Sequence, residues 1–165
     1  MSQPDTTQDV TILATQVLDM ARAKGVRIAT AESCTGGLII GALTEIAGSS
    51  DVVDRGFITY SNAAKIEMLG IDPTTLDTHG AVSEQIASQM ARGALANSHA
   101  DLTVSVTGIA GPGGSDFKPE GRVCFGVAQT GQPIETTTIE FGPLGRSNVR
   151  HATVQMALVM LRDAL

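Results

Sequence analysis

A serine beside the predicted start of a helix is the residue in this chain best suited to chemistry. Ser33 follows residues 26–31, an apolar run typical of a strand, and precedes apolar residues that recur at helical spacing from residue 38. A serine in such a turn can attack a carbonyl carbon, because the free amides of a helix N-terminus favour the negative charge that develops. The amides expected to hold this oxyanion belong to Thr35, Gly36 and Gly37. The alternative is that Ser33 only caps the helix, which is the commoner use of such a serine.

A serine nucleophile needs a base, and Lys65 is the candidate that the sequence offers. The three histidines lie in a turn, near a helix end and early in the last helix, with no metal-ligand spacing between them. To accept a proton near neutral pH, the pKa of Lys65 has to fall from about 10.4 to about 7–8 through burial or a nearby positive charge. Tyr60, the only tyrosine, lies at the predicted strand end that opens the same segment. The alternatives are a solvated first-turn lysine and an aromatic residue whose hydroxyl lies in water.

The same residues contain a second possible chemistry, that of a Glu–Lys–Cys amidase triad. Because side chains alternate in a strand, Glu32 and Cys34 can share one face while Ser33 lies on the other. A thiolate beside a helix N-terminus is a plausible nucleophile. The simpler interpretation, which we favour, is that Cys34 is a small packing residue.

A glycine-rich segment and two arginines could bind an anionic ligand. Residues 107–114 follow a predicted strand and could surround a phosphate with backbone amides, although they match neither of the common phosphate-loop motifs. Arg146 and Arg150 are four residues apart, hence on one helix face, and could clamp a phosphate or a carboxylate. The alternatives are an ordinary turn between elements and a solvated helix face.

The expected fold is a three-layer α/β/α sandwich with a mixed, mostly parallel sheet, because predicted helices alternate with predicted strands. Helices are expected at residues 10–24, 38–46, 63–69, 83–95 and 147–164. Strands are expected at residues 26–31, 52–60, 102–106, 123–128 and 136–141. Ligands of such sheets gather at the carboxyl ends of the strands, so the three polar loops at residues 32–37, 60–65 and 107–114 should meet in one cleft if their strands are parallel neighbours.

Length and composition favour one globular domain over residues 1–165, with residues 1–7 as a loose leader. The net charge of −6 disfavours binding to nucleic acid or to an anionic membrane, although local amides can still hold a small anion. No run of about 18 apolar residues predicts a membrane span. The two cysteines form neither a disulfide framework nor a zinc cluster, and they indicate reduced thiols in a cytoplasmic protein.

Taken together, four stretches of the chain resemble the CinA C-terminal domain family. They are residues 30–37 (TAESCTGG), 60–65 (YSNAAK), 80–84 (GAVSE) and 107–114 (TGIAGPGG). The resemblance extends from the first helix to the last, and four motifs in order are far more specific than any one of them. This family includes the nicotinamide-nucleotide amidases, and the chain is similar to their stand-alone form, without the additional N-terminal domain of larger members.

The resemblance implies hydrolysis of the carboxamide of nicotinamide mononucleotide to nicotinate mononucleotide and ammonia. It implies Ser33 as nucleophile, Lys65 as general base and Tyr60 as a residue that orients Lys65 or carries its proton. It also implies an α/β/α fold, a homo-oligomer and no metal or cofactor. The residues expected to bind substrate are Glu32, Cys34, Asn62, Thr107, Gly108, Ala110, Gly111, Gly113, Arg146 and Arg150.

Two segments depart from the family pattern. Members commonly have Gly-Asp-Arg before the last helix, whereas residues 141–146 read FGPLGR and lack the acidic residue. Residues 115–121 keep Lys-Pro but contain an unusual Asp-Phe and a glutamate. These departures affect the expected phosphate contacts. The alternative function is a non-catalytic nucleotide-binding module, or an interaction domain in competence or recombination, that keeps the same fold.

Overall fold

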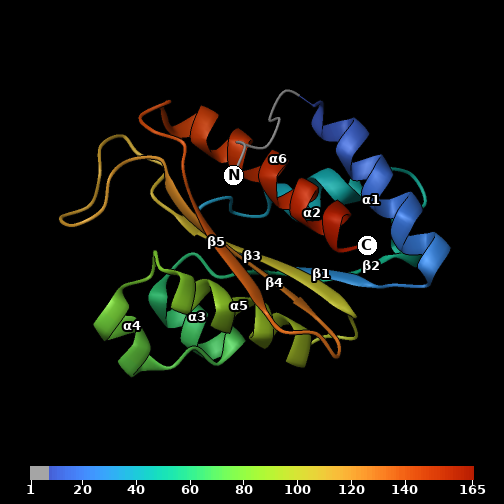
Figure 1. Ribbon diagram of the computed structural model, residues 1–165, viewed down its shortest axis with the longest axis horizontal. Coiled ribbons are helices and arrows are strands. Elements are labelled where there is room, and N and C mark those ends of the chain that lie inside the picture. Colours follow the sequence, from blue (N-terminus) through green and yellow to red (C-terminus); the bar gives the residue numbers. More distant parts are fainter. Residues whose placement is uncertain (1–7) are drawn as a thin grey trace.

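The computed structural model describes residues 8–165, so the expected leader at residues 1–7 lies outside the described residues. Its centre is a five-stranded sheet in the order β2-β1-β3-β4-β5 (Figure 1). The strands are β1 (Ile28–Glu32), β2 (Val53–Ile58), β3 (Leu102–Gly108), β4 (Arg122–Gln129) and β5 (Glu135–Glu140). The pairs β1–β2 and β1–β3 are parallel, and the pairs β3–β4 and β4–β5 are antiparallel. Four strands therefore run in one direction and β4 opposes them, which confirms the predicted mixed sheet.

Helices cover both faces of this sheet and complete the three layers (Figure 1). On one face lie α1 (Val10–Lys24), α2 (Leu38–Thr44) and α6 (Arg146–Ala164). On the other lie α3 (Asn62–Leu69), α4 (Pro73–His79) and α5 (Glu84–Ala96). The strands β1 and β3 are buried along nearly their whole length, as expected for central strands that helices cover on both sides. The predicted α/β/α class is confirmed.

One helix, which starts at Asp72-Pro73, was not among those expected from the sequence. In the structure these residues begin α4, because the Asp72 carboxylate accepts the Thr74 amide at 2.9 Å and Pro73 occupies the first helical position. Proline fits there, since the first amide of a helix has no partner to lose. A short 3₁₀ turn, η1 (Ser49–Asp51), was also not predicted.

The register of the parallel strands places three loops side by side. Glu32 at the end of β1 pairs with Ile58 of β2 and with Val106 of β3. The chain therefore leaves all three strands at the same edge of the sheet, which confirms the predicted meeting of the three polar loops.

Gly93 lets α5 lie against the end of α3, because a Cβ on this glycine would be 2.1 Å from the Leu69 carbonyl oxygen.

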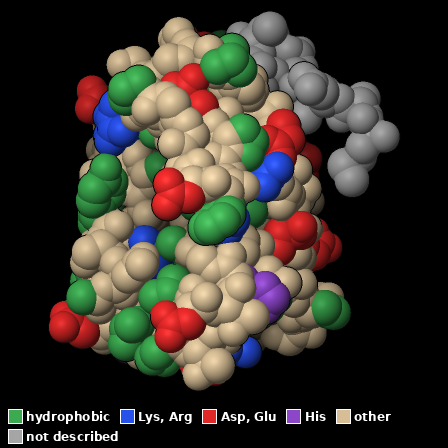
Figure 2. All heavy atoms as spheres, turned by 90° about the vertical axis from the view of Figure 1, so that its left-hand side faces the viewer, with side chains coloured by type: hydrophobic (Ala, Val, Ile, Leu, Met, Phe, Trp, Pro, Cys, Tyr) green, Lys and Arg blue, Asp and Glu red, His purple; other side chains and the backbone are tan. Residues whose placement is uncertain are grey.

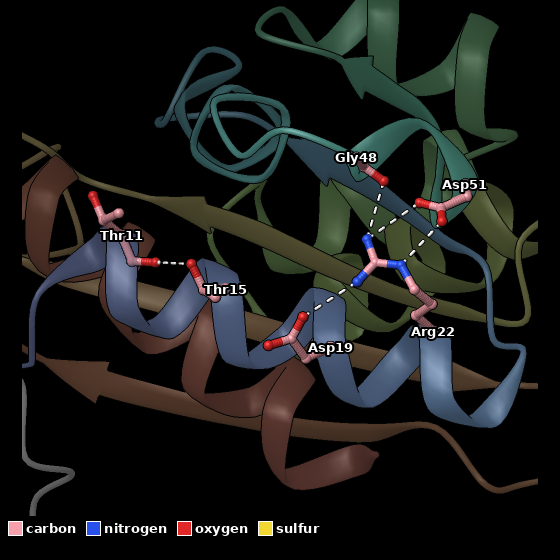
Figure 3. Close-up of polar contacts among 6 residues, drawn as sticks. All are labelled: Thr11, Thr15, Asp19, Arg22, Gly48 and Asp51. Carbon is pink, nitrogen blue, oxygen red and sulfur yellow. Dashed lines mark hydrogen bonds and ion pairs between the residues drawn. The ribbon is translucent and has the colours of Figure 1, made fainter.

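Away from these loops, Arg22 fixes the end of α1 to the turn that precedes β2 (Figure 3). Its Nε donates to Asp51 Oδ2 at 3.0 Å, and its Nη2 donates to the Gly48 carbonyl oxygen at 3.0 Å. Its Nη1 reaches Asp19 Oδ1, one turn earlier in α1, at 3.2 Å. Arg22 is thus engaged in structure at the far end of the sheet from the loops. Within residues 8–165 no helix has the length and hydropathy needed to cross a membrane.

Candidate active site

The turn after β1 is fixed by the buried carboxylate of Glu32. This carboxylate accepts hydrogen bonds from the Thr30 and Thr35 hydroxyls at 3.1 and 2.7 Å. It also accepts the amides of Gly37, Ile39 and Ile40 at 3.2, 2.9 and 2.9 Å. Glu32 therefore caps the N-terminus of α2, where a negative charge is favoured and where no N-cap side chain does so. The Glu32 carboxylate, expected to contact substrate, is instead buried and engaged by the protein on both of its oxygens.

Arg150 holds the same turn from the other side. From the second turn of α6, its Nε donates to the Cys34 carbonyl oxygen at 3.1 Å and its Nη2 to the Thr35 carbonyl oxygen at 3.2 Å. The guanidinium therefore positions the backbone that follows Ser33 and is not the expected anion clamp. Such bonds to successive carbonyls restrict the turn to one conformation.

Ser33 and Lys65 meet on the face of the sheet that carries α3. Lys65 Nζ lies 2.9 Å from Ser33 Oγ, although the residues are 32 positions apart in sequence. Both are buried: Ser33 is 8% exposed and Lys65 only 1%. The nucleophile and base predicted from the sequence are thus within hydrogen-bond distance of each other.

The remaining partners of Lys65 are two backbone carbonyls, from Thr59 at 2.9 Å and Tyr60 at 3.3 Å. With the amine neutral, its two N–H groups can donate to these carbonyls while its lone pair faces the Ser33 hydroxyl. With the ammonium formed, the third proton can be donated to Ser33 Oγ. The same geometry therefore serves both protonation states of a general base.

The surroundings of Lys65 favour its neutral form. Burial lowers the pKa of Lys65 below its ordinary value, opposed in part by the neighbouring Cys34. Within residues 8–165 no carboxylate lies within ion-pair distance of the Lys65 ammonium. No carboxylate in the described protein therefore compensates for removing this charge from water.

The Glu–Lys–Cys triad is not assembled. As the strand alternation predicts, Cys34 belongs to the core beneath α1, α2 and α6, and the Glu32 carboxylate turns toward α2 on that same face. Lys65 lies on the opposite face and hydrogen-bonds Ser33. Burial raises the pKa of the Cys34 thiol to about 11, so this thiol stays protonated at neutral pH.

Two of the three expected oxyanion donors are already used within the turn. The Gly36 amide donates to the Ser33 carbonyl oxygen at 3.1 Å, and the Gly37 amide donates to Glu32 Oε1 at 3.2 Å. The Thr35 amide has no acceptor among residues 8–165. The amides of Gly36 and Gly37 are therefore not free, because they form the turn and the helix cap.

A small cavity opens beside the Ser33–Lys65 pair. It has a volume of about 270 Å³ and is lined by Ser33, Cys34, Tyr60, Gly108, Ala110 and Arg146. Arg146 closes one side, since its Nη1 donates to the Gly111 carbonyl oxygen at 2.7 Å and its Nη2 to the Tyr60 hydroxyl at 3.0 Å. The Tyr60 side chain is 62% exposed, and its hydroxyl contacts Arg146 instead of Lys65. Tyr60 therefore contacts Lys65 through its backbone carbonyl and not through its phenol.

Other expected binding residues have structural roles or lie outside the cavity. The Thr107 hydroxyl donates to the Ala81 carbonyl oxygen at 2.8 Å, which ties β3 to the segment before α5. Asn62 is exposed at the first position of α3 and does not line the cavity. Gly108 does line the cavity, and close packing against β4 requires glycine there, because a Cβ would lie 2.7 Å from a Val123 methyl. Among the described residues, no group of three or more His, Cys, Asp or Glu side chains could hold a metal ion.

Thr59, whose carbonyl contacts Lys65, was not among the site residues expected from the sequence. Neither was Glu120, whose side chain contacts Gly111 and Gly113 in the glycine-rich loop. A backbone carbonyl leaves no residue-type signal, so the contribution of Thr59 could not be found from sequence. Glu120 was visible only as a departure from the family pattern.

The chain is similar to known proteins in both sequence and structure. A model of the CinA C-terminal domain matches residues 10–165. The chain is 49% identical over 154 residues to a nicotinamide-nucleotide amidohydrolase PncC of Enterobacter agglomerans, covering 93% of this chain and 92% of that protein. A crystal structure of the competence/damage inducible protein CihA from Agrobacterium tumefaciens is similar, with a TM-score of 0.90, 51% identity, and 98% and 97% of the two chains covered.

Other relatives are much longer than this chain. It is 46% identical over 150 residues to a putative competence-damage inducible protein of Caldicellulosiruptor saccharolyticus. That match covers 90% of this chain but only 36% of the relative. The chain thus spans about a third of the length of such relatives, whereas it spans nearly all of the amidohydrolase.

Proposed function

This chain belongs to the CinA C-terminal domain family, and we propose that it is an amidohydrolase that releases ammonia from the carboxamide of nicotinamide mononucleotide. The product is nicotinate mononucleotide. The observation that carries this proposal is the buried Lys65 amine 2.9 Å from Ser33 Oγ, beside a cavity that Ser33 lines. The similarity to an amidohydrolase of the same length, named for this substrate, supports the choice of reaction.

The first half of the reaction forms an ester with Ser33. Ser33 Oγ attacks the carboxamide carbon while neutral Lys65 accepts the hydroxyl proton. The amide oxygen becomes negative in the tetrahedral intermediate, and of the three expected donors the Thr35 amide is the one with no acceptor among the described residues. The carbon–nitrogen bond then breaks, Lys65 returns the proton to the departing nitrogen, and ammonia leaves.

The second half restores the enzyme. Lys65, neutral again, accepts a proton from a water molecule that attacks the ester carbon. The bond between this carbon and Ser33 Oγ breaks, and the proton on Lys65 returns to Ser33. Because Lys65 hydrogen-bonds Ser33 in either protonation state, both half-reactions use one arrangement of the base.

The remainder of the substrate extends from the cavity past Tyr60 and Arg146, which lie on its wall. Arg146 is the cationic side chain placed to meet an anionic group there, in place of Arg150, which holds the turn. Binding of this remote part positions the amide against Ser33. Free nicotinamide is therefore expected to be a poor substrate.

We further propose that this activity belongs to the salvage of pyridine nucleotides in the cytoplasm. Both cysteines, Cys34 and Cys124, are buried and unpaired, which suits a reducing compartment. The product differs from the substrate only in carrying a carboxylate where the amide was. A pathway that consumes it must accept the acid form of the pyridine ring.

The test is ammonia release from nicotinamide mononucleotide by wild type, Ser33→Ala and Cys34→Ala, with folding checked by circular dichroism. We expect Ser33→Ala to lose about 10³-fold or more in kcat/KM, as is usual for loss of a nucleophile. Cys34→Ala is the matched control, one residue away, and should retain activity. No release by folded wild type would contradict the proposal and favour a module that binds nucleotides without turnover. Loss only in Cys34→Ala would transfer the chemistry to the thiol.

A further inference from the structure

The glycine-rich loop between β3 and β4 is folded around the side chain of Glu120. A Cβ on Gly111 would lie 1.7 Å from Glu120 Oε1, and Gly111 has a φ of +91°, so glycine is required there on two grounds. The Gly113 amide donates to the same carboxylate oxygen at 3.2 Å. The carboxylate thus occupies the place that the amides of such a loop offer to an anion.

Among the described residues, no lysine or arginine forms an ion pair with this carboxylate. Lys118 donates to the carbonyl oxygens of His79, at 2.7 Å, and Val82. Arg146 donates to the Gly111 carbonyl oxygen and to the Tyr60 hydroxyl. At this end of the molecule acidic and basic side chains are interspersed with apolar ones, without a basic patch that would outweigh the charge (Figure 2).

The loop that holds Glu120 forms one wall of the catalytic cavity. Ala110 lines the cavity, and the next residue, Gly111, lies against the Glu120 carboxylate. A substrate with its amide at Ser33 and its remainder directed past Ala110 therefore approaches this carboxylate. Two like charges that approach in a partly buried site repel each other more strongly than in bulk water.

We propose that Glu120 is a specificity-determining residue that weakens recognition of the phosphate of a nucleotide substrate relative to the uncharged hydroxyl of the nucleoside. This inference rests on the proposed amidohydrolase function and names the substrate class of that site. The loop is filled by the protein's own carboxylate, so an uncharged hydroxyl group at the distal end of the substrate meets no repulsion there.

The test compares kcat/KM for nicotinamide mononucleotide and for nicotinamide riboside in wild type, Glu120→Gln and Asp116→Asn. Glutamine keeps the size of the side chain and an acceptor for Gly113. We expect Glu120→Gln to raise kcat/KM for the nucleotide about five- to tenfold, as expected for removing one charge at short range, and that for the riboside less than twofold. The increase should shrink in 0.5 M salt, because charges more than about 4 Å apart are then largely screened from each other.

Asp116→Asn is the matched control, because it removes the same charge from an exposed position in the same loop. It should change neither substrate by more than twofold. Equal changes for the two substrates in Glu120→Gln, or no change in either, would overturn the inference. So would a similar increase for the nucleotide in Asp116→Asn, since net charge alone would then explain it.

A second readout separates this inference from the proposed function. Calorimetry with ribose 5-phosphate measures phosphate binding without turnover, and Glu120→Gln should bind it about fivefold or more tightly than wild type. If no variant releases ammonia from either substrate but binding tightens in this way, the amidohydrolase proposal fails and the effect of Glu120 stands. If ribose 5-phosphate binds wild type and Glu120→Gln equally, the inference about Glu120 fails, whatever the activity.

Discussion

At the scale of single residues, the proposed chemistry depends on an amine that the fold removes from water without pairing it with a carboxylate. Lys65 is almost completely buried and its polar partners are one hydroxyl and two carbonyls. Desolvation disfavours the ammonium, which is why the pKa of Lys65 is lowered. The lysine is thereby brought toward the protonation state that a base requires.

This lowered pKa predicts how activity and stability change with pH. The kcat/KM should rise with pH to a plateau, with its midpoint below the ordinary lysine pKa of 10.5. Between the two pKa values the unfolded chain binds more protons at Lys65 than the folded one, so the free energy of unfolding should rise with pH over that interval. A pH–rate profile and urea unfolding at several pH values measure the two effects.

Lys65→Met tests the assignment of both effects to this residue. The variant keeps an unbranched side chain without a titratable amine, so it should lose activity and the pH-dependent part of the stability attributed to Lys65. A wild-type midpoint at or above 10.5 would contradict the lowered pKa. Retained activity in Lys65→Met would contradict the role as base.

At the scale of secondary structure elements, Glu32 connects the end of β1 to the start of α2. Its five hydrogen bonds reach from Thr30 in the strand to Ile40 in the helix. Arg150 adds a third element, since α6 holds the carbonyls of the same turn. Ser33 is thus placed by a strand and two helices, none of which contains it.

Glu32→Gln should therefore lower both stability and activity. The glutamine amide nitrogen cannot accept a hydrogen bond, so some of the donors that Glu32 satisfies lose their acceptor, and the charge at the helix N-terminus is lost. We expect the free energy of unfolding to fall by about 2–4 kcal/mol, measured by urea denaturation, because bonds to charged acceptors are worth more than neutral ones.

The control for this prediction is Glu45→Gln, at the exposed C-terminal end of α2. It removes the same charge from the same helix without breaking a buried network, and it should change stability by less than about 0.5 kcal/mol. Equal effects of the two substitutions would show that Glu32 does not organise the turn.

At the scale of the whole molecule, the cavity exists because three strands end at one edge of the sheet. β1 supplies Ser33, the segment after β2 supplies Tyr60 and Lys65, and β3 leads into the loop that contains Ala110. Helix α6 adds Arg146, which lines the cavity and donates to the Gly111 carbonyl oxygen. No single segment contains the site, so its formation requires the complete sheet.

The predicted homo-oligomer belongs to this scale and stays a prediction. Two large apolar side chains, Phe117 and Leu144, are 91% and 47% exposed in loops at the same end of the paired strands β4 and β5. Exposed apolar side chains of this size are typical of contact surfaces. Light scattering coupled to size exclusion should give a mass that is a multiple of 17.0 kDa, and a monomer at all concentrations tested would contradict it.

The sequence by itself determined the alternation of helices and strands and the opposite faces to which Ser33 and Cys34 belong, and it singled out Ser33 and Lys65 as the proposed nucleophile and base. Buried strands and amphipathic helices follow local hydrophobic patterns, and alternation along a strand separates Ser33 from Glu32 and Cys34. The family resemblance singled out Lys65 as the base, but its burial depends on α3 packing against the sheet, which local patterns do not specify.

Only the tertiary structure decided which candidate groups remain free to bind. The amides of Gly36 and Gly37, the Glu32 carboxylate and the Arg150 guanidinium all suit a ligand by residue type. Each is instead bound within the protein, because buried polar groups need partners and the fold brings those partners from distant segments. Glu120 shows the same effect, since its carboxylate fills a loop whose glycines alone would indicate an anion site.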